Sequence, residues 1–135
     1  MCVFAELYFK SRRRYGKKKL KNCLVIEDEF LIGCFVKSTL ERGGYKVGKI
    51  IDNEPEGVAA ILKMKPDFVV VDKNLKDYGC GIRIVKKCKE KLDIPYLFIT
   101  GSSKEILERI NAIQCPSLMK PFDAEALLQF VEENK

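Results

Sequence analysis

Five polar side chains stand directly after short apolar runs, at points spread along the whole chain. They are Glu27, Asp28, Asp72, Thr100 and Lys120. Three carboxylates that lie together without a cation repel one another and raise each other's pKa values. Mg²⁺ would remove that conflict, since it prefers carboxylate, water and phosphate oxygens as ligands. A lysine and a hydroxyl nearby would suit an incoming phosphoryl group, whose negative charge must be neutralised.

Each of these residues also has an ordinary structural explanation. A carboxylate pair after a strand often caps a helix, and Asp72 alone could be a turn residue. Thr100 could cap the next helix, and Lys120 could be a surface lysine. The arrival of all of them at successive strand ends, in the order that phosphoryl transfer requires, favours the functional interpretation.

Apolar runs of strand length alternate with segments of helical period from Asn22 onward. The predicted strands cover residues 23–26, 47–51, 68–71, 96–99 and 117–119. Each is followed by a predicted helix, and Asn53 and Asp123 are the expected caps of the second and the last. Strands that are apolar on both faces indicate a parallel sheet covered on both sides. The sequence therefore predicts an α/β, flavodoxin-like, doubly wound five-stranded parallel sheet, order 2-1-3-4-5, with five helices.

The composition excludes several kinds of chemistry and of location. The 135 residues include no histidine, which removes Ser-His-Asp catalysis and histidine-ligated zinc. No apolar run approaches the ~20 residues of a membrane span, so no transmembrane segment is expected. The six cysteines form no C-x-x-C pair and match no disulfide or zinc framework. Free thiols favour a reducing compartment, and a cytoplasmic location is expected.

The net charge of +6 is concentrated at the N-terminus. Residues 1–21 hold eight basic residues and one acidic residue, while the remainder carries a net charge of −1. We therefore divide the chain into a basic leader, 1–21, and one domain, 22–135. The leader is expected to be a flexible, solvated tail or an artefact of start-site choice. A phosphate-rich partner or an anionic membrane surface is the functional alternative, and nucleic-acid binding is not expected.

The segment 24–133 resembles a two-component response-regulator receiver domain of the CheY type. The matching motifs are Val25-Ile26-Glu27-Asp28-Glu29, Pro66-Asp67-Phe68-Val69-Val70-Val71-Asp72, Phe98-Ile99-Thr100-Gly101 and Lys120-Pro121-Phe122. The resemblance implies that Asp72 accepts a phosphoryl group from a phosphohistidine on a partner protein. It also implies that Asp28, Asp72 and the backbone carbonyl of Asn74 bind Mg²⁺, with Glu27 holding a metal-bound water.

The same resemblance gives Thr100 and Lys120 their roles. Thr100 would bond a phosphate oxygen, Lys120 would pair with the acyl phosphate, and the Lys120–Pro121 bond would be cis. Ser117 stands where such receivers usually carry Tyr or Phe, so the aromatic toggle is missing. Together with Phe98-Ile99-Thr100-Gly101 and Asn74-Leu75, this is similar to the single-domain receivers called the FAT GUY group, which are associated with stress-response phosphorelays and with kinases of the HWE or a related type.

The sequence thus predicts a single-domain response regulator without an output domain. Its partners would be a sensor histidine kinase or a histidine phosphotransfer protein and an unknown downstream protein. Its only reactions would be Mg²⁺-dependent self-phosphorylation and autodephosphorylation, so it is not expected to be an enzyme with an independent substrate. The alternative is a degenerate receiver that binds proteins independently of phosphorylation. A metal-dependent phosphohydrolase is disfavoured, because Asn74 stands where such enzymes usually have a second aspartate.

Overall fold

The computed structural model describes residues 20–73, 80–101 and 104–135. Its helices and strands alternate along the chain in the order β1 (Asn22–Ile26), α2 (Phe30–Arg42), β2 (Lys46–Val47), α3 (Glu54–Met64), β3 (Phe68–Asp72), α4 (Cys80–Lys89), β4 (Tyr96–Thr100), α5 (Lys104–Ala112), β5 (Ser117–Met119) and α6 (Ala124–Asn134). The five strands form one parallel sheet in the order β2-β1-β3-β4-β5. The predicted α/β fold with five helices is confirmed for the described residues.

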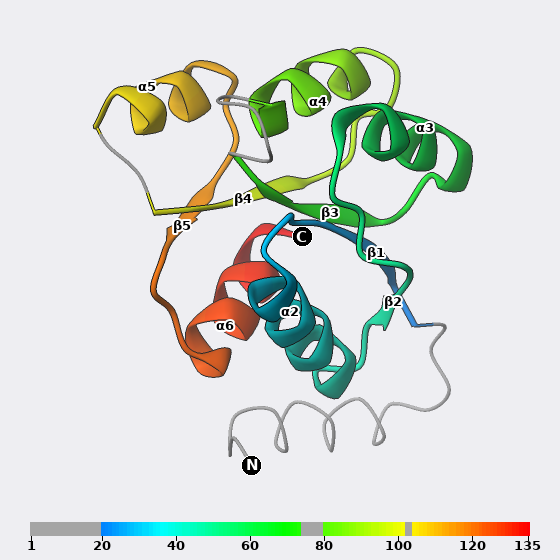
Figure 1. Cartoon of the computed structure of the whole chain (residues 1–135), viewed down its shortest axis with the longest axis vertical. Coiled ribbons are helices and arrows are strands. Elements are labelled where there is room, and N and C mark those ends of the chain that lie inside the picture. Colours follow the sequence, from blue (N-terminus) through cyan, green and yellow to red (C-terminus); the bar gives the residue numbers. More distant parts are fainter. Residues whose placement is uncertain (1–19, 74–79, 102–103) are drawn as a thin grey trace.

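The sheet lies between two layers of helices, α3, α4 and α5 on one face and α2 and α6 on the other (Figure 1). Successive side chains of a strand point to opposite faces, and each strand therefore supplies both cores. In β1, Leu24 and Ile26 pack in the cluster that also holds residues of α4 and α5, whereas Cys23 and Val25 pack with residues of α2 and α6. Because both faces of the sheet are buried, successive positions of the strands are apolar.

Two predicted helix caps are present in the structure. Asn53 Oδ1 accepts a hydrogen bond of 3.0 Å from the backbone N–H of Glu56, at the start of α3. Asp123 Oδ1 accepts one of 2.8 Å from the N–H of Ala126, at the start of α6. These bonds satisfy donors that the first turn of a helix leaves without a partner.

The second strand is shorter than predicted. β2 covers only Lys46–Val47, and the chain pairs with β1 again at Ile51, which forms an isolated bridge with Ile26. The backbone between these points leaves the ladder, and the side chain of Ile50 lies close to Gly33 of α2. Three residues of the predicted strand, 48–50, are therefore not paired with β1, and Ile50 packs against the helix instead.

Within the ranges given above, no helix is long and apolar enough to cross a membrane. The five cysteines in those ranges, Cys23, Cys34, Cys80, Cys88 and Cys115, are free thiols. Nearly all of the leader, residues 1–19, lies outside the described residues. The division of the chain at residue 21 therefore stays a prediction.

Candidate functional site

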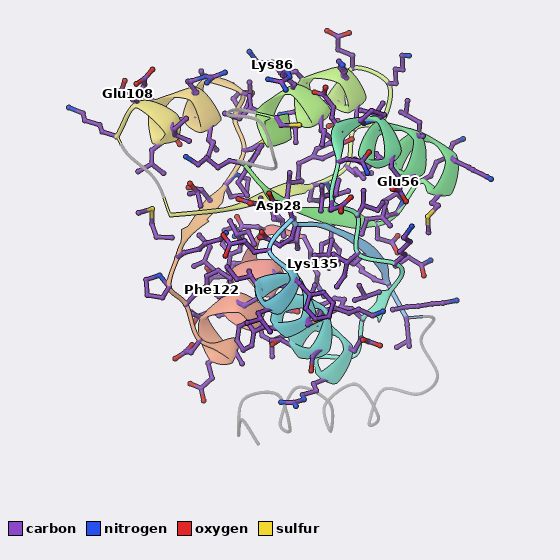
Figure 2. All side chains as sticks on the ribbon, viewed as in Figure 1. Asp28, Glu56, Lys86, Glu108, Phe122 and Lys135 are labelled. Atoms are coloured by element: carbon purple, nitrogen blue, oxygen red, sulfur yellow. The ribbon has the colours of Figure 1, made fainter. Side chains whose placement is uncertain are left out.

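Three carboxylates meet at the carboxyl edge of the sheet. β1 and β3 are neighbours, and Ile26 pairs with Val71, so Glu27 and Asp28 follow β1 beside the place where Asp72 ends β3. One ligand oxygen from each of the three carboxylates lies within 4.8 Å of the others. Figure 2 shows Asp28 just beyond the end of β1. The sequence-based expectation that these residues converge agrees with this geometry.

Lys120 reaches the same cluster from the loop after β5. Its Nζ lies 3.4 Å from Glu27 Oε2 and 3.6 Å from Asp72 Oδ1. It is also 4.0 Å from Glu29 Oε1, a contact that the sequence analysis did not anticipate. Lys120 thus lies within ion-pair distance of three carboxylates at this edge of the sheet.

Thr100 is fully buried at the end of β4. Its backbone carbonyl accepts a hydrogen bond of 2.8 Å from the N–H of Lys120, which fixes the two residues relative to each other. The Lys120–Pro121 peptide bond is cis, as the resemblance implied. β3 and β4 pair with Asp72 opposite Ile99, so Thr100 follows directly beside the acidic cluster.

The pKa of the buried Glu27 carboxyl reflects its burial and the negative charge gathered in the cluster. Burial and, to a smaller extent, the nearby charge of Asp72 raise the pKa of Glu27 to about 8. The N–H of Glu29 donates to Glu27 Oε1 at 3.1 Å and, together with Lys120, opposes this shift of the pKa. A divalent cation would relieve the remaining repulsion, so this donor set fits Mg²⁺.

The backbone that carries Asp72 is held by a residue whose role the sequence analysis missed. The N–H of Gly81, in the first turn of α4, donates to the carbonyl of Lys73 at 2.9 Å. A methyl group at Gly81 would overlap the carbonyl oxygen of Asp72 and would lie 2.7 Å from the Cα of Lys73. Only glycine allows this approach, and a glycine that follows a stretch of polar residues gives little sequence signal for such a contact.

Lys73 is a second residue that the sequence analysis did not single out. It is 5% exposed, and burial lowers the pKa of its amine, while the charge of Asp72 opposes that change. Asn74, the expected source of a metal-binding carbonyl, lies outside the described residues. Ser117 lies in β5 opposite Phe98 and places no aromatic ring at that position.

A pocket of about 310 Å³ opens beside the acidic cluster on the side of α3. Its lining residues are Glu27, Asp28, Phe30, Lys49, Ile50, Asp52 and Glu56. Lys49 forms an ion pair of 2.9 Å with Glu56 on its rim. The acidic cluster is therefore open to solvent and to small ions through Asp28.

The fold and the site together define a domain with an acidic pocket at the carboxyl ends of a doubly wound sheet. Residues 23–132 match the response regulator receiver domain, and the chain belongs to that family. Its relatives are named as response regulators, which places this chain in two-component signalling.

Two curated relatives illustrate the likeness. The chain is 28% identical over 106 residues to the KDP operon transcriptional regulatory protein KdpE of Escherichia coli, which covers 76% of this chain and 46% of KdpE. It is 30% identical over 116 residues to the sensory transduction protein LytT of Bacillus anthracis, which covers 83% of this chain and 46% of LytT. The chain thus spans about half the length of these relatives.

Solved structures show the same domain by itself. The chemotaxis response regulator CheY4 of Vibrio cholerae has a TM-score of 0.76 and 26% identity, and the match covers 85% of this chain and 98% of CheY4. A CheY-like receiver domain protein of Methanospirillum hungatei has a TM-score of 0.77 and 27% identity, covering 85% and 93% of the two chains.

Proposed function

We propose that this chain accepts a phosphoryl group on Asp72 from a histidine kinase or a histidine phosphotransfer protein. The observation that carries the proposal is the convergence of Asp72 with two further carboxylates and with Lys120, 3.6 Å from its Oδ1. Membership of the receiver family supports the same conclusion. The free thiols among the described cysteines favour a reducing compartment such as the cytoplasm for this exchange.

The carboxylate of Asp72 is the nucleophile. One of its oxygens forms the new bond to phosphorus while the bond from phosphorus to the donor nitrogen breaks. Lys120 exchanges its contact with the free carboxylate for one with the phosphoryl oxygens, and the Thr100 hydroxyl donates to another of them. Both residues therefore stabilise charge on the transferred group.

Mg²⁺ would be held by Asp28 and Asp72, with the backbone carbonyl of Asn74 as a further ligand and Glu27 beside it. When bound, the ion would neutralise charge on the acceptor and on the incoming phosphoryl group. Glu27 would keep its contact with Lys120, 3.4 Å away, and so orient that side chain toward the cluster. Hydrolysis of the phosphorylated Asp72 returns the domain to its starting state, and the chain needs no other substrate.

Phosphorylation by a small acyl phosphate tests the assignment of Asp72. With Mg²⁺ present, the purified protein should gain the mass of one phosphate group, and Asp72→Asn should gain none. Asp93→Asn is the matched control, because Asp93 is exposed and lies at the opposite edge of the sheet, before β4. A phosphate that persists in Asp72→Asn would contradict the proposal.

We also propose a place within the family. Ser117 without an aromatic ring and the Thr100-Gly101 ending of β4 are similar to the single-domain FAT GUY group. A phosphotransfer screen tests this placement: kinases of the HWE type should phosphorylate the protein faster than other histidine kinases do. Equal rates with both kinds of kinase would contradict it.

A further inference from the structure

The edge of the sheet opposite the acidic cluster carries exposed lysines around the point where the described chain begins. We call this surface the entry patch, and it consists of Leu20, Lys21, Lys46, Lys63, Met64 and Lys65. All six residues are exposed. Leu20 and Met64 are 47% and 55% exposed, so two apolar side chains stand among the lysines of the patch.

Backbone contacts show that the entry patch is continuous. The N–H of Lys46 donates to the carbonyl of Lys21 at 2.9 Å, and the N–H of Asp67 donates to that of Asn22 at the same distance. A methyl group placed on Gly48, just after β2, would lie 3.8 Å from the side chain of Met64, so the end of α3 lies beside β2. The start of β1, the start of β2 and the end of α3 therefore share one surface.

The lysines of the entry patch are not neutralised by neighbouring acids. Within the described ranges, none of its four lysines takes part in an ion pair. Asp67 lies beside the patch, and its Oδ2 accepts a hydrogen bond of 2.7 Å from the N–H of Asn22. The positive charge of the patch is thus available to an external anion.

The sequence that precedes the entry patch has the same two properties. Six of the seven residues from 3 to 9 are apolar or aromatic, and seven of the ten residues from 10 to 19 are Lys or Arg. Apolar groups beside a basic cluster suit a surface of anionic lipid, in which the apolar groups enter the interface and the cations attract the headgroups. A nucleic acid would use the cations but would offer aliphatic residues such as Val3 and Leu7 no comparable environment.

We propose that the N-terminal segment and the entry patch together bind an anionic lipid surface. β1 has five residues and spans about 17 Å, and Asp28 follows its far end. When the entry patch is bound to lipid, the acidic cluster faces away from the membrane. It thereby avoids repulsion by the negatively charged headgroups. The phosphoacceptor stays open to protein partners while the chain is bound to the membrane surface.

Sedimentation with vesicles tests this proposal on the full chain. The protein should bind vesicles that contain phosphatidylglycerol and should not bind vesicles of phosphatidylcholine alone, and binding should weaken as ionic strength rises. Lys46→Gln/Lys63→Gln should weaken binding by about fivefold or more, since each basic residue near a lipid surface adds attraction. Lys86→Gln/Lys104→Gln is the matched control with less than about a twofold effect, because Lys86 is exposed on the outer side of α4 (Figure 2).

A second variant separates lipid binding from simple attraction of charge. Phe4→Ser/Leu7→Ser keeps every charge and should reduce vesicle binding at physiological ionic strength by about tenfold, because two apolar groups no longer enter the interface. Unchanged binding of this variant, or equal effects of the two lysine pairs, would overturn the proposal. Binding to single-stranded or duplex DNA without binding to the anionic vesicles would overturn it in favour of a nucleic-acid partner.

Discussion

The two edges of the sheet hold their charges in different ways. At the carboxyl edge, Glu27, Asp72 and Thr100 are buried, and Lys120 contacts two carboxylates directly. At the opposite edge, Lys46 and Lys63 are exposed and form no ion pair among the described residues. Substitution of one member of a buried group of contacting charges has a large effect on the others. Exposed charges interact weakly through solvent, so the effects of substituting them are small and add up. Substitutions should therefore affect the fold and the chemistry much more at the first edge than at the second.

The largest effect is expected for Asp28→Ala, measured as the affinity for Mg²⁺. Loss of a residue that only orients a metal ligand typically costs 10–100-fold in affinity, so loss of a direct carboxylate should cost about 100-fold or more. Isothermal titration with Mg²⁺ measures this directly. Asp52→Asn, which removes a charge from the rim of the same pocket, is the control and should change affinity by less than about tenfold. Equal losses in the two variants would mean that Asp28 does not touch the ion.

The next effect is expected for Gly81→Ala, measured as the free energy of unfolding. The new methyl group would overlap the carbonyl oxygen of Asp72, and such overpacking typically costs about 1–3 kcal/mol. Because the backbone of Asp72 must move, phosphorylation should also slow.

Gly101→Ala is the matched control for Gly81→Ala at the same edge. Among the described residues that are not its chain neighbours, its methyl group would meet the Cβ of Lys120 alone, at an ordinary contact distance of 3.9 Å. Urea denaturation should therefore give a change within about 0.5 kcal/mol for this control. If Gly81→Ala were no more destabilising than Gly101→Ala, the backbone at the end of β3 could move at little cost in free energy. That result would contradict the expectation that substitutions at the carboxyl edge have large effects.

A smaller effect is expected for Tyr45→Phe at the opposite edge. The Tyr45 hydroxyl donates to Glu132 Oε2 at 2.8 Å and joins the start of β2 to the end of α6. Its loss should cost about 0.5–1.5 kcal/mol, at the lower end of that range because Lys135 keeps an ion pair of 3.1 Å with Glu132. Phosphorylation should proceed at an unchanged rate. A slower rate would mean that the two edges are coupled through β1 or α6.

The carboxyl edge could be predicted from sequence because each of its residues directly follows a buried run. Phe68 to Val71 is a short apolar run rich in valine, which favours a buried strand, and Asp72 then stands at its end. The parallel order of strands then brings Asp72 beside Glu27 and Asp28 without any further information.

The parts that could not be predicted depend on contacts between distant elements. β2 ends at Val47, and the side chain of Ile50 packs beside Gly33 of α2. The sequence around Ile50 does not show that a distant helix offers room for this side chain. The approach of Gly81 to Asp72 depends on how α4 packs against the end of β3. The 4.0 Å contact of Glu29 with Lys120 likewise depends on the direction of the loop after β5.

The smallest effect on stability and phosphorylation is expected for removal of residues 1–19. Among the described residues, both hydrophobic clusters are built between Cys23 and Val131, and Leu20 is already 47% exposed. Because the leader is expected to be a solvated tail, its removal should change the free energy of unfolding by no more than about 0.5 kcal/mol. The rate of phosphorylation by a small acyl phosphate should also stay the same, since the entry patch lies at the other end of β1 from Asp28.

The same truncation should abolish binding to anionic vesicles. This one variant therefore distinguishes the function of the carboxyl edge from that of the opposite edge. Thermal unfolding and phosphorylation report on the carboxyl edge and the cores, and sedimentation reports on the entry patch. Retained stability with lost vesicle binding would show that residues 20–135 fold independently, which agrees with the predicted domain 22–135. A large fall in the melting temperature would instead mean that residues 1–19 pack on the domain, and the boundary at residue 21 would then be wrong.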